Sequence, residues 1–98
     1  MIVLHAVFPI DPNERERALA LFEDLVEASN REPGMVEYRA AVDLQDPNVV
    51  RFSEVYEDEA ASSAHLETDH FQRLQDALPE LLDGEPEINR FSAEPIEG

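Results

Sequence analysis

The order in which two hydrophobic periods alternate constrains this chain more than any other feature. Residues 2–8 are apolar and β-branched without a helical period, and residues 35–43 and 49–56 alternate as strands do. Apolar stripes at helical spacing cover residues 18–26 and 71–82, and residues 87–92 carry a weaker strand pattern. This β-α-β-β-α-β order predicts a ferredoxin-like α+β fold with helices on one face of a four-stranded sheet. At 98 residues, the chain has room for a single domain, residues 1–98.

Short signals indicate where these elements begin and end. Asp11-Pro12 starts a helix, because aspartate caps the first turn and proline suits its first position. Pro33-Gly34 ends that helix, and Asp46-Pro47-Asn48 predicts the turn of a hairpin. The second helical region is broken: one helix is expected from about Asp58 to Glu67, and another follows closely. Pro79 predicts a kink or a restart in that second helix.

The first strand has two mostly apolar faces, although helices can cover only one face of the sheet. Ile2, Leu4, Ala6 and Phe8 share one face. The residues left on the uncovered side are Val3, His5, Val7, Glu37, Arg39, Arg51 and Val55. Such a half-apolar, half-ionic surface favours contact with a second sheet, so we expect a homodimer.

Charge excludes several classes of partner. The chain has 23 acidic residues against 7 basic ones, all arginine, for a formal net charge of −16. A field this negative repels phosphate backbones and anionic membrane surfaces. Neither nucleic acid nor membrane is therefore expected as a partner. The acidic residues are spread along the whole chain. They predict a salt-loving source, where ions screen self-repulsion; a very acidic mesophilic protein is the alternative.

The chain has no cysteine, which excludes disulfides, thiolate metal sites and thiol nucleophiles. Its apolar N-terminus lacks the basic segment of an export signal and is too short to span a membrane. We therefore expect a cytoplasmic protein.

The stretch from Arg51 to Phe71 is where chemistry is expected. Phe52, Glu54 and Tyr56 share one face of a strand, and His65 lies on the helix that follows. If that helix folds back over the strand, these residues share a cavity. An imidazole with an ordinary pKa of about 6.5 suits proton abstraction from a phenol or quinol. The alternative is a surface histidine hydrogen-bonded to a neighbour.

Two further residues are candidates for the site. A buried Glu54 would have a raised pKa and could relay a proton, or it could make a structural hydrogen bond, for example to an arginine. Tyr38 could orient a substrate oxygen or simply line the core. Neither choice follows from the sequence.

A metal site is not expected. On a continuous helix, the five-residue separation of His65 and His70 would point them roughly 140° apart. No pair of histidines one helical turn apart and no two-histidine, one-carboxylate spacing is visible.

The segment GMVEYRAAVDLQDPNVVRFSEVYEDEAASSAHLETDHFQRL carries a family resemblance. The features that carry it are the helix end Glu32-Pro33-Gly34, whose glycine is the first residue of the segment, and then Tyr38, Glu54-x-Tyr56-x-Asp58, Ala61, His65 and His70-Phe71. With these features the chain resembles the antibiotic biosynthesis monooxygenase (ABM) domain, the group that includes small quinol monooxygenases. The resemblance implies a dimeric α/β barrel with a pocket between each sheet and its own helices.

The resemblance also implies an activity: cofactor-independent monooxygenation of a quinol-like or phenolic small molecule by molecular oxygen. A non-catalytic binding module and an isomerase of a small polar metabolite remain alternatives. The haem-degrading branch has asparagine, tryptophan and histidine where this chain has Ala6, His65 and Gln75, so haem breakdown is not expected. The expected catalytic residues are His65, Glu54 and Tyr38. The expected substrate contacts are Phe52, Tyr56, Phe71, Leu4 and Ala6.

Overall fold

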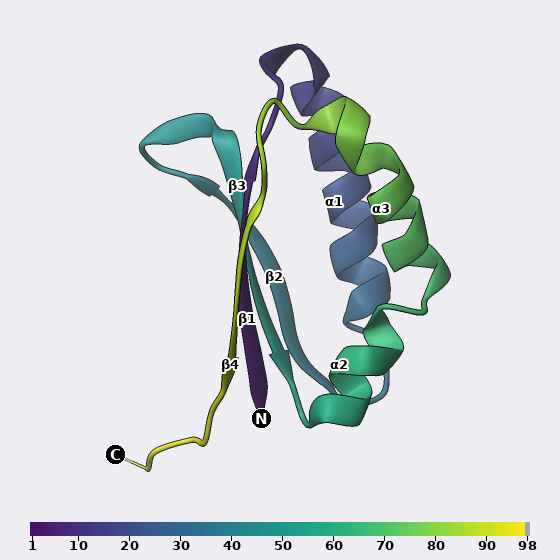
Figure 1. Cartoon of the computed structure of the whole chain (residues 1–98), viewed down its shortest axis with the longest axis vertical. Helices are drawn as coiled ribbons and strands as arrows, with labels where there is room; N and C mark the ends of the chain where they lie inside the picture. Colours follow the sequence, from purple (N-terminus) through teal and green to yellow (C-terminus); the bar gives the residue numbers. More distant parts are fainter. Residues whose placement is uncertain (98) are drawn as a thin grey trace.

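The sheet has four antiparallel strands in the order β2-β3-β1-β4, and the helices cover one of its faces (Figure 1). The computed structural model describes residues 1–97. Its elements are β1 (Ile2–Pro9), η1 (Pro12–Glu14, a 3₁₀ turn), α1 (Arg15–Ser29), β2 (Met35–Asp43), β3 (Asp46–Tyr56), α2 (Glu59–His65), α3 (Asp69–Leu81) and β4 (Glu87–Ser92). The predicted α+β fold is confirmed, including the break in the second helical region. Within residues 1–97, no helix is both long and apolar enough to span a membrane.

The strand register determines which side chains share the covered face. In β1, Leu4 lies opposite Glu54 of β3 and opposite Arg90 of β4. On the next strand, Tyr38 of β2 lies opposite Glu54. Paired residues of antiparallel strands project to the same side. These four side chains therefore face the helices together.

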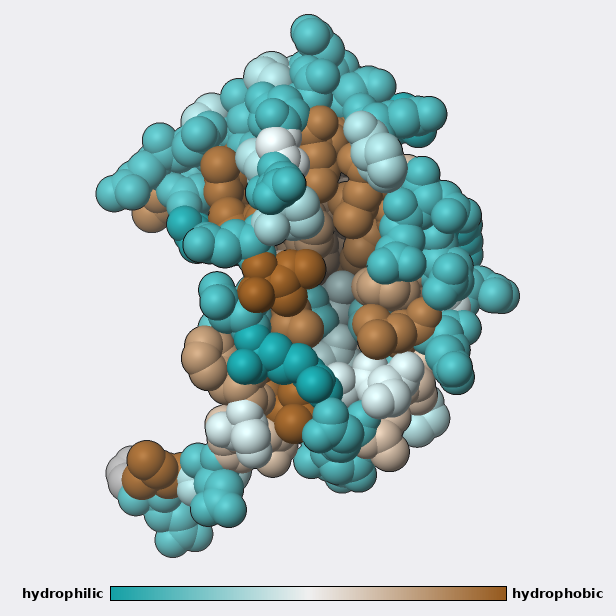
Figure 2. All heavy atoms as spheres, viewed as in Figure 1, coloured by the Kyte–Doolittle hydropathy of each residue, from teal (hydrophilic) through white to brown (hydrophobic). Residues whose placement is uncertain are grey.

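The core lies between the sheet and helices α1 and α3. Phe8, Phe22 and Phe52 contact one another, with ring centroids 5.1 to 5.8 Å apart. Leu25 of α1 and Leu74 of α3 close this cluster from the helix side. Figure 2 shows the result: apolar side chains fill the strip between sheet and helices, and the outer sides of the helices are hydrophilic.

The end of α1 is tied to β2 by one side chain. The Asn30 amide donates to the backbone oxygens of Val26 and Tyr38, both at 2.9 Å, and its oxygen accepts from the Tyr38 N–H at 3.1 Å. These bonds satisfy backbone groups that the helix end would leave open. They also fix the strand position from which the Tyr38 side chain enters the covered face.

Two predicted details of the hairpin are corrected. The turn falls at residues 44–45, because Asp43 caps it through the Gln45 N–H at 2.7 Å, and Asp46 already starts β3. The alternation expected over residues 35–43 breaks at Val36, because a register irregularity between Met35 and Glu37 takes this side chain off the face of Tyr38 and leaves it 51% exposed. An extra residue in one strand shifts the alternation, and hydrophobic periodicity does not mark it.

Pro79 does not restart the helix as expected. Helix α3 continues through it to Leu81. A proline removes one backbone donor and crowds the turn before it, and here the helix ends two residues later, so little helix remains to be disturbed.

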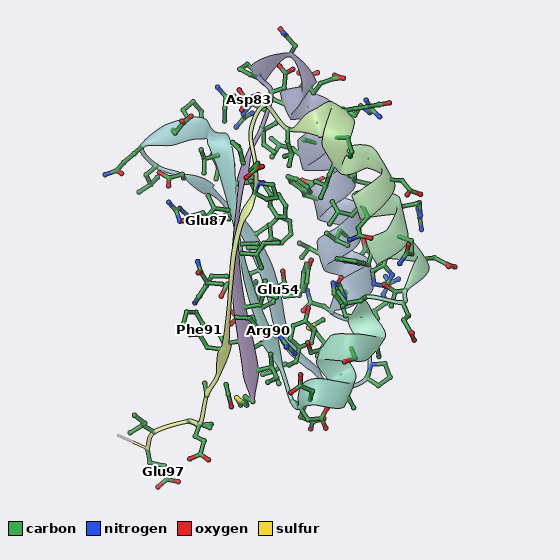
Figure 3. All side chains as sticks on the ribbon, viewed as in Figure 1. Glu54, Asp83, Glu87, Arg90, Phe91 and Glu97 are labelled. Carbon is green, nitrogen blue, oxygen red and sulfur yellow. The ribbon has the colours of Figure 1, made fainter. Side chains whose placement is uncertain are left out.

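The other face of the sheet is uncovered. Val3 lies opposite Val55 and Phe91 in the register, so all three side chains share that face. Figure 3 shows Phe91 pointing away from the helices and Arg90 pointing toward them. The Phe91 ring is 52% exposed and contacts the ring of His5. The expected homodimer on this face stays a prediction.

Candidate functional site

A cavity of about 330 Å³ lies between the sheet and the helices and opens between α2 and β4. Figure 2 shows the hollow on this face of the molecule. The residues singled out from the sequence that line it are Leu4, Ala6, Tyr38, Glu54, Tyr56, His65 and Phe71. The other lining residues are Phe8, Glu59, Ser62, Ser63, Leu66, Leu74, Ile88 and Arg90. Its volume is at the lower end of the range for small-molecule sites, which fits a ligand of one or two rings.

Phe52, expected as a substrate contact, is the exception, because it is not among the residues that line the cavity. Its ring is buried in the core against Phe8, Phe22 and Tyr38 rather than in the cavity wall. Its two neighbours across the sheet are alanines, which leave room for the ring to reach α1. Phe52 therefore supports the Tyr38 ring from behind.

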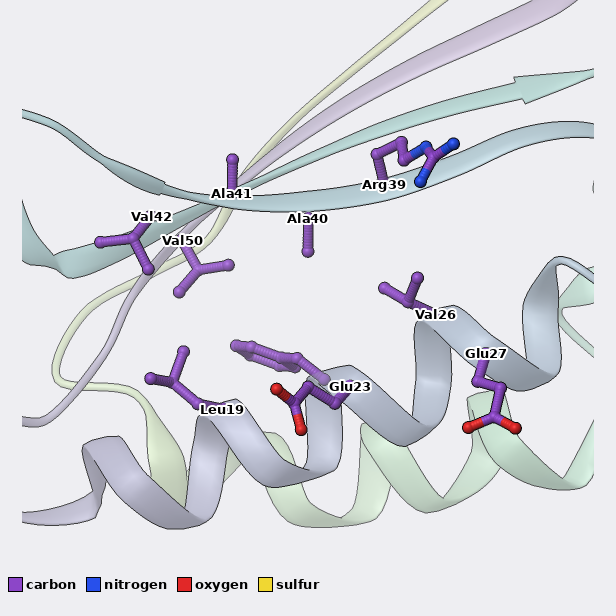
Figure 4. A pocket seen from close by; sticks show the side chains of 10 residues that line it. Leu19, Glu23, Val26, Glu27, Arg39, Ala40, Ala41, Val42 and Val50 are labelled. Atoms are coloured by element: carbon purple, nitrogen blue, oxygen red, sulfur yellow. The ribbon is translucent and has the colours of Figure 1, made fainter.

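A larger groove lies elsewhere, between α1 and β2 (Figure 4). Its volume is about 430 Å³, and its walls are mostly aliphatic. The lining residues are Leu19, Phe22, Glu23, Val26, Glu27, Arg39, Ala40, Ala41, Val42 and Val50. It has no histidine or tyrosine hydroxyl to move a proton, so the smaller cavity is the better candidate for chemistry.

His65, the last residue of α2, stands in the inner wall of the cavity. Its side chain is almost fully buried, and its ring packs against those of Tyr38, Tyr56 and Phe71, with centroids 5.1 to 5.7 Å away. One ring nitrogen, Nδ1, lies 2.8 Å from Oε2 of Glu32. The other, Nε2, is buried and has no hydrogen-bond partner within residues 1–97. A ligand hydroxyl is the kind of partner that this nitrogen lacks.

Burial also sets the protonation state of this ring. It lowers the pKa of His65, against the opposing effect of the hydrogen bond and charge of Glu32. The ring is therefore neutral at pH 7. A neutral imidazole is the form that can accept a proton.

Glu54 and Tyr56 form a hydrogen-bonded pair on the strand face opposite α2. The Tyr56 hydroxyl donates to Oε1 of Glu54 at 2.5 Å, so the partner of this carboxyl is a tyrosine and not an arginine. Burial raises the pKa of Glu54 to about 7, although the Tyr56 hydrogen bond opposes this. Near neutral pH, Glu54 can therefore give or take a proton. Burial, and next the charge of Glu54, raise the pKa of both Tyr38 and Tyr56, so both hydroxyls stay protonated donors.

The sequence missed Glu32, which brings two histidines together. Its Oε2 lies 2.8 Å from Nδ1 of His65 and 2.6 Å from Nε2 of His70. The expected divergence of His65 and His70 is therefore wrong. Helix α2 ends at His65, and α3 begins anew at Asp69, so the two rings do not follow one helical course.

Thr68 makes this break. Its hydroxyl caps α3 by accepting from the Phe71 N–H at 3.2 Å and donates to the His65 carbonyl at 2.7 Å. The same residue therefore ends one helix and starts the next. The only trace of Glu32 in the sequence was its place in the Glu32-Pro33-Gly34 helix end, and that spacing says nothing of a partner 33 residues away.

Glu32, His65 and His70 also form the group that could hold a metal ion. Each offers one ligand atom, and these atoms lie within 4.8 Å of one another. Two imidazoles and a carboxylate are donors that first-row divalent ions accept. In this structure, the same atoms are hydrogen-bonded to one another.

Arg90 is the one arginine among the lining residues, and it lies at the mouth of the cavity. Arg90 donates through Nη2 to Glu59 at 2.8 Å and to the Ser62 hydroxyl at 3.0 Å. Figure 3 shows Arg90 and Glu54 on the helix side of the sheet. Because Glu59 neutralises this guanidinium and Glu54 lies further in, the cavity is poorly suited to an anionic ligand.

Comparison with known proteins concerns the family and the fold of the chain. The sequence profile of the family described as "Antibiotic biosynthesis monooxygenase" matches residues 1–77. A Bacillus subtilis protein named "Putative monooxygenase YcnE" is 34% identical over 90 residues, which make up 92% of this chain and 95% of that protein. An uncharacterised Synechocystis protein, sll1783, is 31% identical over 92% of this chain. The chain spans about three fifths of that relative, 61% of its length.

Solved structures share the same fold. A crystal structure described as an antibiotic biosynthesis monooxygenase superposes with a TM-score of 0.89 at 30% identity, covering 97% of this chain and all of the other, 100%. This similarity extends over the sheet and the helices.

Proposed function

The chain belongs to the antibiotic biosynthesis monooxygenase family, and from that premise we propose that it is a cofactor-independent monooxygenase of a small, uncharged phenol or quinol. The observation that carries the proposal is the buried Nε2 of His65, which has no hydrogen-bond partner within residues 1–97 and belongs to a residue that lines a largely apolar cavity. An unpaired ring nitrogen in such a place is costly for stability unless a ligand uses it.

The chemistry needs a base, a dry pocket and oxygen. His65 takes the proton of the substrate hydroxyl on Nε2, and Glu32 stabilises the imidazolium that forms. The phenolate, now electron-rich and poorly solvated, reduces molecular oxygen and forms a carbon–oxygen bond with it. His65 returns its proton to the peroxide, and loss of water breaks the O–O bond and the C–H bond at the same carbon, which leaves a quinone. One oxygen atom stays on that carbon as a carbonyl, the other leaves as water, and the substrate supplies all the electrons.

The remaining polar groups orient the substrate. Tyr38 lines the cavity and keeps its hydroxyl hydrogen, and the Glu54–Tyr56 pair offers a donor or an acceptor depending on the proton of Glu54. Since Nε2 of His65 is shielded by neighbouring rings, a substrate reaches it only when one of those rings moves aside. Phe71, which is only partly buried, is the ring with most room to do so.

The residues that line the cavity also bear on the two alternative functions. An isomerase of a phosphorylated metabolite would need free cations, and the lining arginine is neutralised by Glu59. A non-catalytic binding module would need only the walls. Replacing His65 therefore distinguishes the monooxygenase from the binding module, whereas a ligand-binding measurement does not.

The test is oxygen uptake with menadiol and a panel of uncharged phenols, each corrected for oxidation without protein. Replacing the base (His65→Gln) is expected to lower kcat by roughly 10²- to 10⁴-fold. His5→Gln, on the uncovered face of the sheet, is the control and should keep full activity. If the wild type consumes oxygen no faster than His65→Gln, yet both bind the phenol, the chain is a binding module.

We also propose that a second copy of the chain covers the open face of the sheet. Support comes from its composition: Val3, Val55 and the exposed Phe91 lie beside ionic side chains such as Arg39 and Glu37. An isologous interface can match these charges in pairs, because each copy offers both signs.

A further inference from the structure

Glu32 occupies a position between two imidazoles that belong to different helices. His65 closes α2, and His70 lies in the first turn of α3. Both rings contact the same carboxylate oxygen, at 2.8 and 2.6 Å, and the Glu32 side chain is only 11% exposed. If Glu32 accepts both contacts as an ionised carboxylate, each of the two ring nitrogens carries a hydrogen, because an ionised carboxylate can only accept.

This requirement fixes the tautomer of His65. If Nδ1 carries the hydrogen of the neutral ring, Nε2 carries the lone pair. That is the buried nitrogen without a partner in the cavity wall. In water, a neutral histidine side chain favours the opposite tautomer, with the hydrogen on Nε2. With the carboxylate at Nδ1, the lone pair is placed on the nitrogen that a substrate reaches when one of the shielding rings moves aside.

The backbone around Glu32 is built for this contact. Gly34 has a φ of +80°, and a Cβ placed on it would lie 2.7 Å from Cβ of Ala61 in α2. Helix α2 therefore rests directly on the turn that follows Glu32. The Gly34 carbonyl also accepts from the Glu57 N–H at 2.8 Å, just before α2. This close approach brings the end of α2 to Glu32.

We propose that Glu32 is a positioning residue: it holds His65 in the Nδ1–H tautomer, so that Nε2 faces the substrate as the base, and His70 holds Glu32 in place. The role of Nε2 as a base rests on the proposed function. The tautomer does not, since it concerns the hydrogen bond between His65 and Glu32 in the protein without substrate. This division lets the two ideas be tested separately.

The first measurement uses the wild-type protein without substrate. In a long-range ¹H–¹⁵N spectrum of the ¹⁵N-histidine-labelled chain at pH 7.5, His65 should show a protonated Nδ1 and an unprotonated Nε2. A His65 ring found mainly with the hydrogen on Nε2, or in an even mixture, overturns the proposal. No variant has to fold for this result to count.

Variants then test the cause. Glu32→Ala should move the hydrogen of His65 to Nε2, and Glu32→Gln, which keeps an oxygen acceptor, should preserve the Nδ1–H form at least in part. Glu27→Ala, an exposed carboxylate on α1 paired with Arg31, is the control and should leave the spectrum unchanged. If both Glu32 variants keep the wild-type tautomer, Glu32 does not set it.

A metal titration examines the competing use of the same atoms. Zinc chloride added in equimolar amount should leave the Nδ1–H signal of His65 in place. Loss of that signal, with saturable binding abolished by Glu32→Gln, would make the three residues a metal centre and overturn the positioning role.

Activity provides a separate readout. Glu32→Ala is expected to lower kcat by on the order of 10²-fold with little change in KM, since a base in the wrong tautomer still leaves the cavity walls intact. Combined with His65→Gln, it should cause no further loss, because both changes remove the same base. A merely structural Glu32 would give additive losses. If the wild type is inactive on every phenol, the proposed function fails, and the spectra still decide the role of Glu32.

Discussion

Glu54 is a single residue whose burial costs stability. Its carboxyl is buried between two tyrosines on the covered face of the sheet, where no arginine pairs with it in residues 1–97. Burial raises its pKa to about 7, so at neutral pH about half the molecules hold it protonated. A chain selected for stability alone would have a glutamine or an apolar residue there.

A pH prediction follows for this residue. The folded pKa of about 7 lies above the unfolded value of 4.5, so the folded state keeps a proton that the unfolded state has lost over that range. The stabilisation is complete at or below pH 4.5 and disappears as the pH rises through 7. Glu54→Gln removes this dependence on pH. From acid to neutral pH, the free energy of unfolding of the wild type should therefore fall by ~3 kcal/mol relative to that of the variant.

Urea unfolding of both proteins at pH 4 and pH 8 measures this difference. Glu16→Gln, at an exposed position of α1, is the control and should track the wild type at both values. A constant gap between wild type and Glu54→Gln would mean that Glu54 is ionised or solvated throughout.

At the scale of elements, the site depends on where helices stop. Three segments meet at His65: the end of α2, the start of α3 and the turn after α1. None of these segments alone would bring the two imidazoles to the Glu32 carboxylate. The turn allows the meeting because Gly34 accepts a left-handed backbone and lets Ala61 approach.

Gly34→Ala tests this packing. A methyl group there would force a left-handed conformation on an L-residue and collide with Ala61 of α2, so the free energy of unfolding should fall by about 2 kcal/mol or more. Gly84→Ala is the matched control: its Cβ would lie 3.3 Å from the Pro9 side chain, and its backbone is not left-handed. Urea unfolding of the two variants should separate them clearly. Equal losses would show that the turn after α1 tolerates a side chain.

At the scale of the whole molecule, the open sheet face decides the assembly. Val55→Glu places a charge in the middle of that face, between Val3 and Glu37 in the register. The variant should sediment as a monomer and the wild type as a dimer. Leu44→Glu, at the fully exposed tip of the hairpin, is the control and should leave the dimer intact. A monomeric wild type at tens of micromolar protein would end the dimer proposal.

The net charge of −16 also acts on the molecule as a whole. Arg17, Arg31, Arg51 and Arg90 are already paired with carboxylates at the surface, so many of the acidic groups repel one another without compensation. We expect Tm to rise steadily as potassium chloride increases from 0.1 M to 2 M, while the screening length falls from about 10 Å to below about 3 Å.

Thermal unfolding followed by circular dichroism measures the slope of Tm against salt. A double variant with two exposed acidic residues of α1 neutralised, Glu16→Gln and Asp24→Asn, should give a shallower slope. A Tm that levels off near 0.2 M would favour an ordinary acidic protein over a salt-loving one.

The sequence by itself determined the elements, their order and the inward face of β3. Those features are local: a period of two or of 3.6 residues is set by backbone geometry, and burial of the apolar side selects the face. It therefore placed Glu54, Tyr56 and Tyr38 toward the helices, and His65 on the helix beside them, before any contact was known. The ABM resemblance pointed to a pocket in the same place.

Only the tertiary structure decided which side chains meet. Phe52 shares the strand face of Glu54, yet it fills the core because alanines flank it and α1 packs above it. Glu32 lies 33 positions from His65, and their contact exists because a glycine turn, a helix break and a threonine cap bring three chain segments together. No local period encodes such a meeting, since it depends on the packing of elements that are distant in the chain.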